Sequence, residues 1–97
     1  MIQSFANQAT KDIFDGRSSK KARTLLPVEL QDKAVERLEV LDNAPTMYSI
    51  QNTPGFALKK LSGEREGQFS IRINDQYRIC FYWHRNDAYH VEITDYH

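Results

Sequence analysis

The last third of the chain alternates between apolar and polar residues, which is the pattern of half-buried strands. In "FSIRINDQYRICF" (residues 69–81) every second side chain is apolar on either side of Asn74-Asp75, a pair that favours turns. Strands are therefore predicted at about 67–74, 76–84 and 88–95, with a second turn at 85–88. The expected apolar face consists of Phe69, Ile71, Ile73, Tyr77, Ile79, Phe81, Trp83, Tyr89, Val91 and Ile93.

The first half of the chain has the period of helices instead. After Pro27, a residue suited to a first helical turn, an apolar stripe recurs at spacings of four, four and three. "DNAP" ends this helix, because the residue before a proline avoids helical geometry. A shorter helix is predicted over 7–15 and ended by Gly16. The stripe is formed by Leu30, Ala34, Leu38 and Leu41.

The remaining segments carry weaker signals. "MIQSF" indicates a short strand that contains the apolar residues Ile2 and Phe5, and "RSSKKART" (17–24) a polar connector. Residues 45–55 fit either a short helical turn or an irregular strand, whereas 56–61 reads as a strand. The predicted fold class is α+β, with two N-terminal helices packed on one face of a small antiparallel sheet, in a single domain of residues 1–97.

Charge is balanced overall but unevenly distributed. Thirteen basic and thirteen acidic residues give a formal net charge of zero. Residues 29–42 hold five acids and two bases, whereas 56–85 hold six bases and three acids, and "RSSKKAR" (17–23) holds four bases and no acid. The basic stretches are thus suited to attract a polyanion, and the acidic stretch would repel it. The alternative is that these charges form a solvated mixed surface.

Several functional classes are not expected. A single cysteine, Cys80, excludes an internal disulfide and fits a structural thiol in a reducing cytoplasm. Three histidines without close pairing do not indicate zinc, and no glycine-rich phosphate loop is present. No apolar run of membrane-spanning length and no signal-peptide pattern occurs. We therefore expect no metal, no cofactor and no membrane partner.

The polar face of the predicted sheet carries the candidate chemistry. Guanidinium groups bind phosphates and aromatic rings stack unpaired bases, so this face fits RNA. The alternative is cross-strand pairing, in which Arg72 or Arg78 meets Glu92. The face is expected to display Gln68, Ser70, Arg72, Asn74, Gln76, Arg78, Cys80, Tyr82, His84, His90, Glu92, Thr94 and Tyr96.

Three stretches of the chain resemble a known family. "LSGEREGQFSIRINDQYRICFYW" followed by a closing "VEITDYH" resembles the HigB toxins of the RelE-like superfamily, and "MIQSFANQATKDIFDG" matches the start of that family. The resemblance covers nearly the whole chain. It implies a ribosome-dependent ribonuclease that cuts messenger RNA in the decoding site. It also implies a helix-turn-helix antitoxin of the HigA type, and contact with operator DNA only through the antitoxin complex.

The resemblance also implies roles for particular residues. Arg78 matches the arginine that stabilises the scissile phosphate, and Gln76 stands where relatives have a hydrogen-bonding side chain. The closing Asp95, Tyr96 and His97 match a terminal triplet implicated in activity. Where some relatives have a histidine and a lysine before the glycine, this chain reads "KKLSG", so that Lys59 or Lys60 takes the cationic role. The expected RNA-binding set is completed by Arg72 and Asn74.

The expected mechanism needs no metal, because the RNA 2′-hydroxyl attacks the adjacent phosphorus. Arg78, helped by Arg72, stabilises the charge that develops, and His97 moves protons, since its ordinary pKa of about 6.5 suits both directions. Asp95 orients His97, and Tyr96 stacks a base or donates a hydrogen bond. The alternative function is an inhibitor that binds RNA or the ribosome without cutting. Codon preference, the general base and the antitoxin-docking face stay open.

Overall fold

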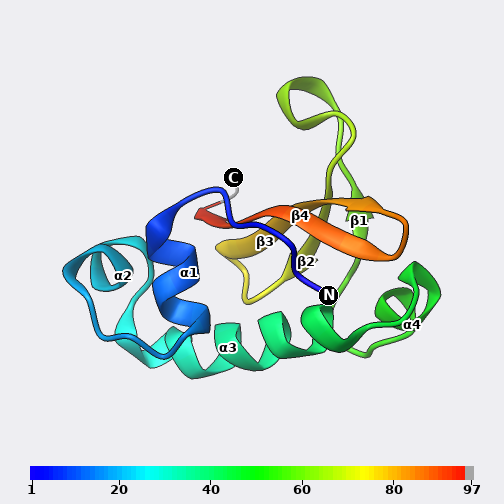
Figure 1. The fold of residues 1–97 in the computed structure, drawn as a ribbon. Helices are drawn as coiled ribbons and strands as arrows, with labels where there is room; N and C mark the ends of the chain where they lie inside the picture. The colour runs from blue at the N-terminus through cyan, green and yellow to red at the C-terminus, as the bar shows by residue number, and fades with distance from the viewer. Residues whose placement is uncertain (96–97) are drawn as a thin grey trace.

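The computed structural model describes residues 1–95 as helices packed against one antiparallel sheet (Figure 1). The strands run in the order β1-β2-β3-β4. They are β1 (Lys59–Lys60), β2 (Phe69–Arg72), β3 (Tyr77–His84) and β4 (Asp87–Asp95). The helices are α1 (Gln8–Phe14), α2 (Lys20–Leu25), α3 (Val28–Asn43) and α4 (Met47–Gln51), with a 3-10 turn η1 (Gly63–Arg65) between β1 and β2. The α+β prediction is confirmed.

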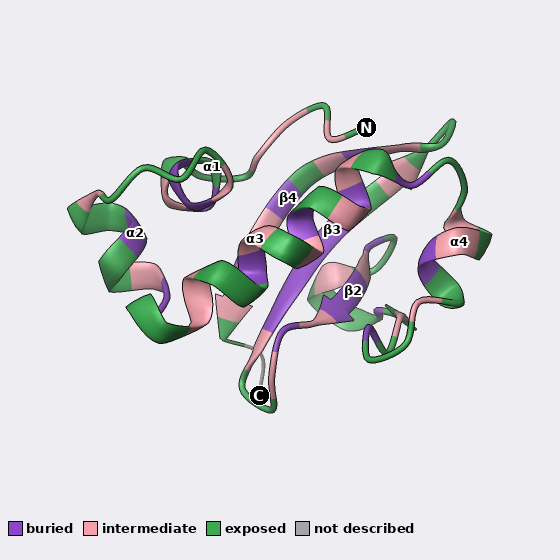
Figure 2. Cartoon of the chain, turned by 90° about the horizontal axis from the view of Figure 1, so that it is seen from below, coloured by how far each residue is buried: buried purple, intermediate pink, exposed green. Residues whose placement is uncertain are grey.

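The core lies between α3 and the sheet. Figure 2 shows α3 crossing β3 and β4, with α1 and α2 towards one end of it and α4 towards the other. The apolar stripe predicted for α3 is confirmed at Ala34, Leu38 and Leu41, which are fully buried. They pack in one cluster with the inward side chains of the strands, Ile79 and Ile93 among them. Truncating such a leucine to alanine costs about 2–5 kcal/mol of stability.

Two helices form where the sequence did not predict them firmly. α2 begins inside the segment predicted as a polar connector, because Ser19 caps it by accepting a hydrogen bond from the Ala22 amide at 3.0 Å. Ala22 is fully buried, so the connector prediction was wrong from residue 20 onwards. Residues 45–55, which fitted either a short helical turn or an irregular strand, contain α4, whose residue Ile50 is buried.

The chain start runs beside β4 rather than forming a full strand. Ile2 and Phe5 make isolated parallel bridges to Ala88 and Val91. The predicted strand at 56–61 is likewise reduced to β1, which holds two residues. The chain start borders the sheet at β4, and β1 forms the opposite edge, so β2 and β3 are central strands.

A bulge in β4 overturns the prediction for Tyr89. Cys80 pairs with Glu92 but Tyr82 pairs with Tyr89, so β4 has one residue more than β3 between these pairs. His90 accommodates it with a φ of 56°. Tyr89 therefore lies opposite Tyr82 on the face away from the core, and Ala88 is the fully buried residue of this stretch.

Among the described residues, no helix is both long enough and apolar enough to span a membrane.

Candidate functional site

Strand register gathers three cationic residues on the face of the sheet opposite α3. Arg72 pairs with Arg78, and Arg78 pairs with Thr94, so these side chains form one row. Lys59 pairs with Ser70 in the next row. Partners directly opposite in a sheet share a face. Lys59, Arg72 and Arg78 therefore lie on one side of the sheet.

The two lysines of β1 are separated by the same rule. Lys60 pairs with Phe69, whose side chain packs against the core, so Lys60 belongs to the other face. Both lysines are exposed. Of the two candidates for a cationic role, register thus groups Lys59 with Arg78 and sets Lys60 apart.

Three hydrogen bonds hold the side chain of Arg78 on this face. It is 8% exposed. Its Nε donates to Ser70 Oγ at 2.7 Å, and its Nη2 donates to the carbonyl oxygens of Ala57 at 2.6 Å and of Ser70 at 3.4 Å. These three acceptors are oxygen atoms fixed by the sheet and the loop before β1, so their bonds orient the guanidinium. The prediction of an open face was wrong here, since Ser70 and Cys80 are also fully buried.

The connection between β1 and β2 lies on the same side of the sheet as Arg78. Figure 1 shows it rising from the sheet on the side away from α3. Arg65 Nη1 donates to Gln68 Oε1 at 3.0 Å and to Glu92 Oε1 at 3.1 Å. The ion pair of Glu92 is thus with Arg65, and its predicted alternative pairing with Arg72 or Arg78 was wrong. Nothing in the alternation of the strands indicates Arg65, whose contacts depend on the path of this loop.

The turn between β2 and β3 uses three of the predicted polar residues. Arg72 forms an ion pair with Asp75. Asn74 Oδ1 accepts from the amides of Gln76 at 2.9 Å and Tyr77 at 2.7 Å, so this side chain shapes the turn. Gln76 Nε2 donates to Asp95 Oδ2 at 2.9 Å and so joins the turn to the end of β4.

Asp95 lies at the same end of the sheet as Arg78 but belongs to the other face. It pairs with Tyr77, the neighbour of Arg78 in β3. A groove of about 1000 Å³ adjoins it. The groove brings "RSSKKAR" into the neighbourhood of the predicted site, because Lys20 and Lys21 line it together with Asp95. The predicted site residues Tyr96 and His97 lie outside the described residues.

The buried thiol of Cys80 is poorly suited to nucleophilic chemistry. Burial raises its pKa and outweighs the opposing charges of Arg65 and Arg78. A protonated thiol is a weak nucleophile, which agrees with the structural role predicted for it. Within residues 1–95, no group of three His, Cys, Asp or Glu side chains is arranged to hold a metal ion.

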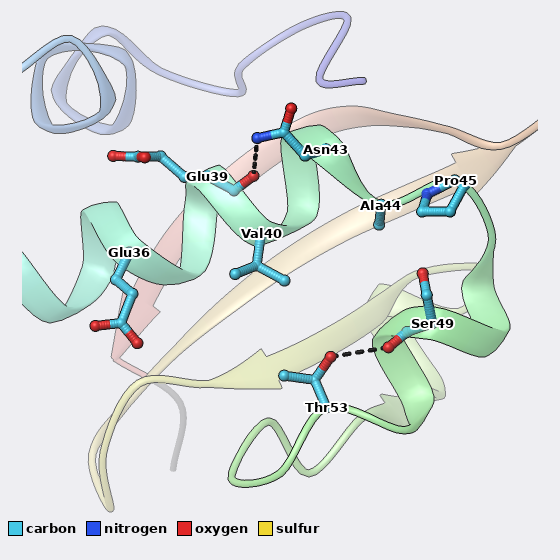
Figure 3. Close-up of a pocket in the computed structure, with 8 residues that line it drawn as sticks. All are labelled: Glu36, Glu39, Val40, Asn43, Ala44, Pro45, Ser49 and Thr53. Atoms are coloured by element: carbon cyan, nitrogen blue, oxygen red, sulfur yellow. Dashed lines mark hydrogen bonds between the residues drawn. The ribbon is translucent and has the colours of Figure 1, made fainter.

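A second cavity, of about 460 Å³, lies between α3 and α4 (Figure 3). Its wall includes Glu36 and Glu39 from the acidic stretch at 29–42. Asn43 Nδ2 donates to the Glu39 carbonyl at 2.8 Å, and Thr53 Oγ1 to the Ser49 carbonyl at 2.8 Å. Carboxylates repel phosphate, so this cavity is a poor place for RNA.

Comparisons with known proteins agree on one family. Residues 3–97 match the family described as "RelE-like toxin of type II toxin-antitoxin system HigB". The chain is 32% identical over 97 residues to "Endoribonuclease HigB" of Proteus vulgaris, with complete coverage of both proteins. It is 35% identical over 63 residues to "Toxin HigB-1" of Vibrio cholerae, which covers 65% of this chain and 66% of that protein.

Solved structures support the fold. The chain resembles a chain of the "YoeB-YefM complex from Staphylococcus aureus" with a TM-score of 0.62 at 21% identity. The match covers 100% of this chain and 98% of that one. A heterotetrameric form of the same toxin–antitoxin complex matches equally well.

Proposed function

The chain belongs to the HigB family of RelE-like toxins of type II toxin–antitoxin systems, and we propose that it is an endoribonuclease that cuts messenger RNA on the ribosome. The relative matched over its full length is named an endoribonuclease. The observation that carries the proposal is the fixed guanidinium of Arg78, which is held by Ser70 and Ala57 beside Arg72.

The reaction follows from what such a group can stabilise. The 2′-hydroxyl oxygen of the RNA bonds to the adjacent phosphorus and loses its proton. The bond from phosphorus to the 5′-oxygen breaks, and that oxygen takes up a proton. The products are a 2′,3′-cyclic phosphate and a 5′-hydroxyl. Negative charge builds on the phosphoryl oxygens between these steps, and Arg78 stabilises it because its position is set before the substrate arrives. No metal ion is needed, because the RNA supplies the nucleophile.

The other cations hold the strand around the scissile phosphate. Arg72 stands directly beside Arg78, and Lys59 follows in the next row, so both contact neighbouring phosphates. Lys20 and Lys21 line the groove next to Asp95, on the helical side of the sheet, and offer phosphate contacts there. RNA contacts of Lys60, Asn74 and Gln76 stay predictions. Lys60 pairs with Phe69 on the other face of the sheet, Asn74 accepts hydrogen bonds within the turn, and Gln76 donates to Asp95.

Proton transfer is assigned to the chain's closing residues. His97 carries the proton, Tyr96 stacks a base or donates a hydrogen bond, and Asp95 orients His97. The support within the described residues is the bond from Gln76, which fixes the Asp95 carboxylate at the end of β4. Lys59 is the next candidate for the proton, since it lies on the Arg78 face.

Family membership makes an antitoxin the partner of this chain. We propose an antitoxin of the helix-turn-helix type, similar to HigA, with operator DNA contacted only through the complex and with the free toxin acting in the cytoplasm. Expression of the toxin alone should arrest growth, and coexpression of the antitoxin should restore it. Growth that continues with the toxin alone would contradict this assignment.

The deciding experiment is cleavage of a defined messenger on programmed ribosomes, with mapping of the new 5′ ends. Arg78→Ala should slow cutting roughly 10²–10³-fold, and Arg78→Lys should recover little, because lysine lacks the planar fork. Deletion of His97 tests the proton carrier. Lys59→Ala should weaken cutting, and Lys60→Ala is its matched control from the opposite face. Equal effects of the two lysines would contradict the assignment by register.

The same assay tests the alternative function, a non-cleaving inhibitor. A binder of this kind arrests translation and leaves the message intact. It would keep its effect when Arg78 or His97 is replaced. Cuts in the decoding-site codon that vanish in both variants would exclude it.

A further inference from the structure

We propose that Arg37, on the helical side of the sheet, is a positioning residue for Arg78 and acts through the backbone of Phe56 and Ala57. This inference rests on the proposed function of Arg78. Arg37 belongs to α3, whereas the guanidinium of Arg78 lies on the face of the sheet opposite that helix. The segment at residues 55–57 joins the two arginines.

Arg37 holds this segment from two directions. Its Nε donates to the carbonyl oxygen of Arg72, the last residue of β2, at 2.6 Å. Its guanidinium also stacks over the Phe56 ring, 5.2 Å from the ring centroid. One side chain thus ties the end of β2 to the loop that precedes β1.

The loop is attached to β2 by its backbone as well. The Arg72 amide donates to the Phe56 carbonyl at 2.7 Å, and the Phe56 ring is buried. Arg37, Phe56 and Arg72 therefore close a ring of contacts: guanidinium to carbonyl, amide to carbonyl, and guanidinium to aromatic ring. We call these three residues the Arg37 clamp.

Ala57, which directly follows Phe56, connects the clamp to Arg78. The Ala57 carbonyl accepts the 2.6 Å hydrogen bond from Arg78 Nη2. Ala57 has a φ of 46°, a left-handed conformation that is unfavourable for alanine. Such a conformation persists only when neighbouring contacts impose it, and the clamp supplies them on the preceding residue. Released from the clamp, the segment can relax and turn the carbonyl away from Arg78.

The expected consequence is catalytic rather than structural. Displacing a catalytic group by about 1 Å costs on the order of 10²-fold in rate. Arg37→Ala should therefore lower single-turnover cleavage about 10- to 100-fold, with little change in the concentration needed for half-maximal rate. Arg37→Lys keeps a cationic donor for the Arg72 carbonyl and the Phe56 ring but lacks the planar guanidinium, so it should restore part of the loss. Lys33→Ala, one turn earlier on α3 and exposed, is the matched control.

Phe56→Leu provides a second route to the same test, since it removes the ring but keeps an apolar side chain. If the clamp acts as a unit, the double variant with Arg37→Ala should be no slower than the worse single variant. Additive losses in a folded double variant would contradict a shared path.

A readout without RNA separates this inference from the proposed function. In ¹⁵N NMR of the free protein, the Arg78 Nε–H signal should be sharp and slow to exchange with water, because it donates to Ser70. Arg37→Ala should broaden it or speed its exchange, and Arg37→Lys should restore it in part, with backbone spectra and thermal midpoints showing that both variants are folded. An unchanged Arg78 signal in Arg37→Ala would overturn the clamp. If wild-type protein cuts no RNA, the proposed function falls, and the NMR comparison still decides the clamp.

Discussion

Arg72 and Arg78 lie directly opposite each other on β2 and β3, with their side chains on the same face of the sheet. Like charges in this position destabilise a sheet. Asp75 forms an ion pair with Arg72, and Ser70 and Ala57 accept hydrogen bonds from Arg78, so these contacts fix the positions of both guanidinium groups. A phosphate between the two guanidinium groups would relieve the repulsion.

Inorganic phosphate should therefore stabilise the folded protein. A ligand that binds only the folded state raises the unfolding midpoint as its concentration passes its dissociation constant. Phosphate at 10–50 mM is expected to raise the thermal midpoint more than chloride at the same ionic strength. Arg72→Gln should remove this difference. A phosphate effect that persists in Arg72→Gln, or that chloride reproduces, would count against a site between the two arginines.

Ser70 is expected to matter for rate, because its hydroxyl accepts from Arg78 Nε. Ser70→Ala removes that acceptor and leaves a buried donor without it, at a cost of about 1–3 kcal/mol in stability. The protein should stay folded, with cleavage slowed about tenfold. Ser70→Cys introduces a side chain of similar size that is a weaker acceptor. Its cleavage rate should lie between those of the wild type and Ser70→Ala. If folded Ser70→Ala cleaves at the wild-type rate, this bond does not help to position Arg78.

The sequence was sufficient for features that depend on local periodicity. The stripe of α3 and the alternation of β2 and β3 place Leu38 and Ile79 in the core, as predicted. The same alternation put Tyr89 on the core face, which failed because a bulge changes the phase of a strand without changing its composition.

Long-range contacts explain the other differences between the predicted and the observed site. Arg65 reaches Glu92 across 27 positions, and Arg37 reaches the Arg72 carbonyl across 35. Neither partner can be chosen from the spacing of residues, because each depends on where a loop crosses the sheet. The burial of Arg78 also depends on a contact with a loop residue, Ala57. The strand pattern does not show this contact, so it predicted an open face.

Asp12 should make stability depend on pH in the acid range. Hydrogen bonds from Gln8 and Ser19, and then the charges of Arg17 and Lys21, lower the pKa of Asp12 below its ordinary value of 3.8 despite its burial. The folded state thus favours the charged carboxylate. Its contribution is complete above pH 3.8 and is lost as pH falls through the lower folded pKa.

The measurement is urea unfolding of wild type and Asp12→Asn between pH 7 and pH 2. At pH 7 the variant should be less stable, because the bonds of Gln8 and Ser19 to a charged acceptor are lost. The difference in the free energy of unfolding should shrink below about pH 4 as wild-type Asp12 is protonated. A difference that stays constant over the whole range would contradict a lowered pKa.

Because of the bulge, glycine and valine should have opposite effects on stability at two positions of β4, His90 and Thr94. His90 has a φ of 56°, where glycine is tolerated and β-branched residues are strongly disfavoured. His90→Gly should therefore be more stable than His90→Val, by about 1–2 kcal/mol, which is the cost of the left-handed conformation for a residue with a Cβ. At Thr94, which continues the regular pairing of β4 with Arg78, the order should reverse, since valine favours extended strands and glycine weakens them. Thermal or urea unfolding of the four variants measures both differences. If valine is the more stable residue at both positions, β4 does not keep its extra residue at His90 in solution, and Tyr89 then returns to the face that simple alternation predicts.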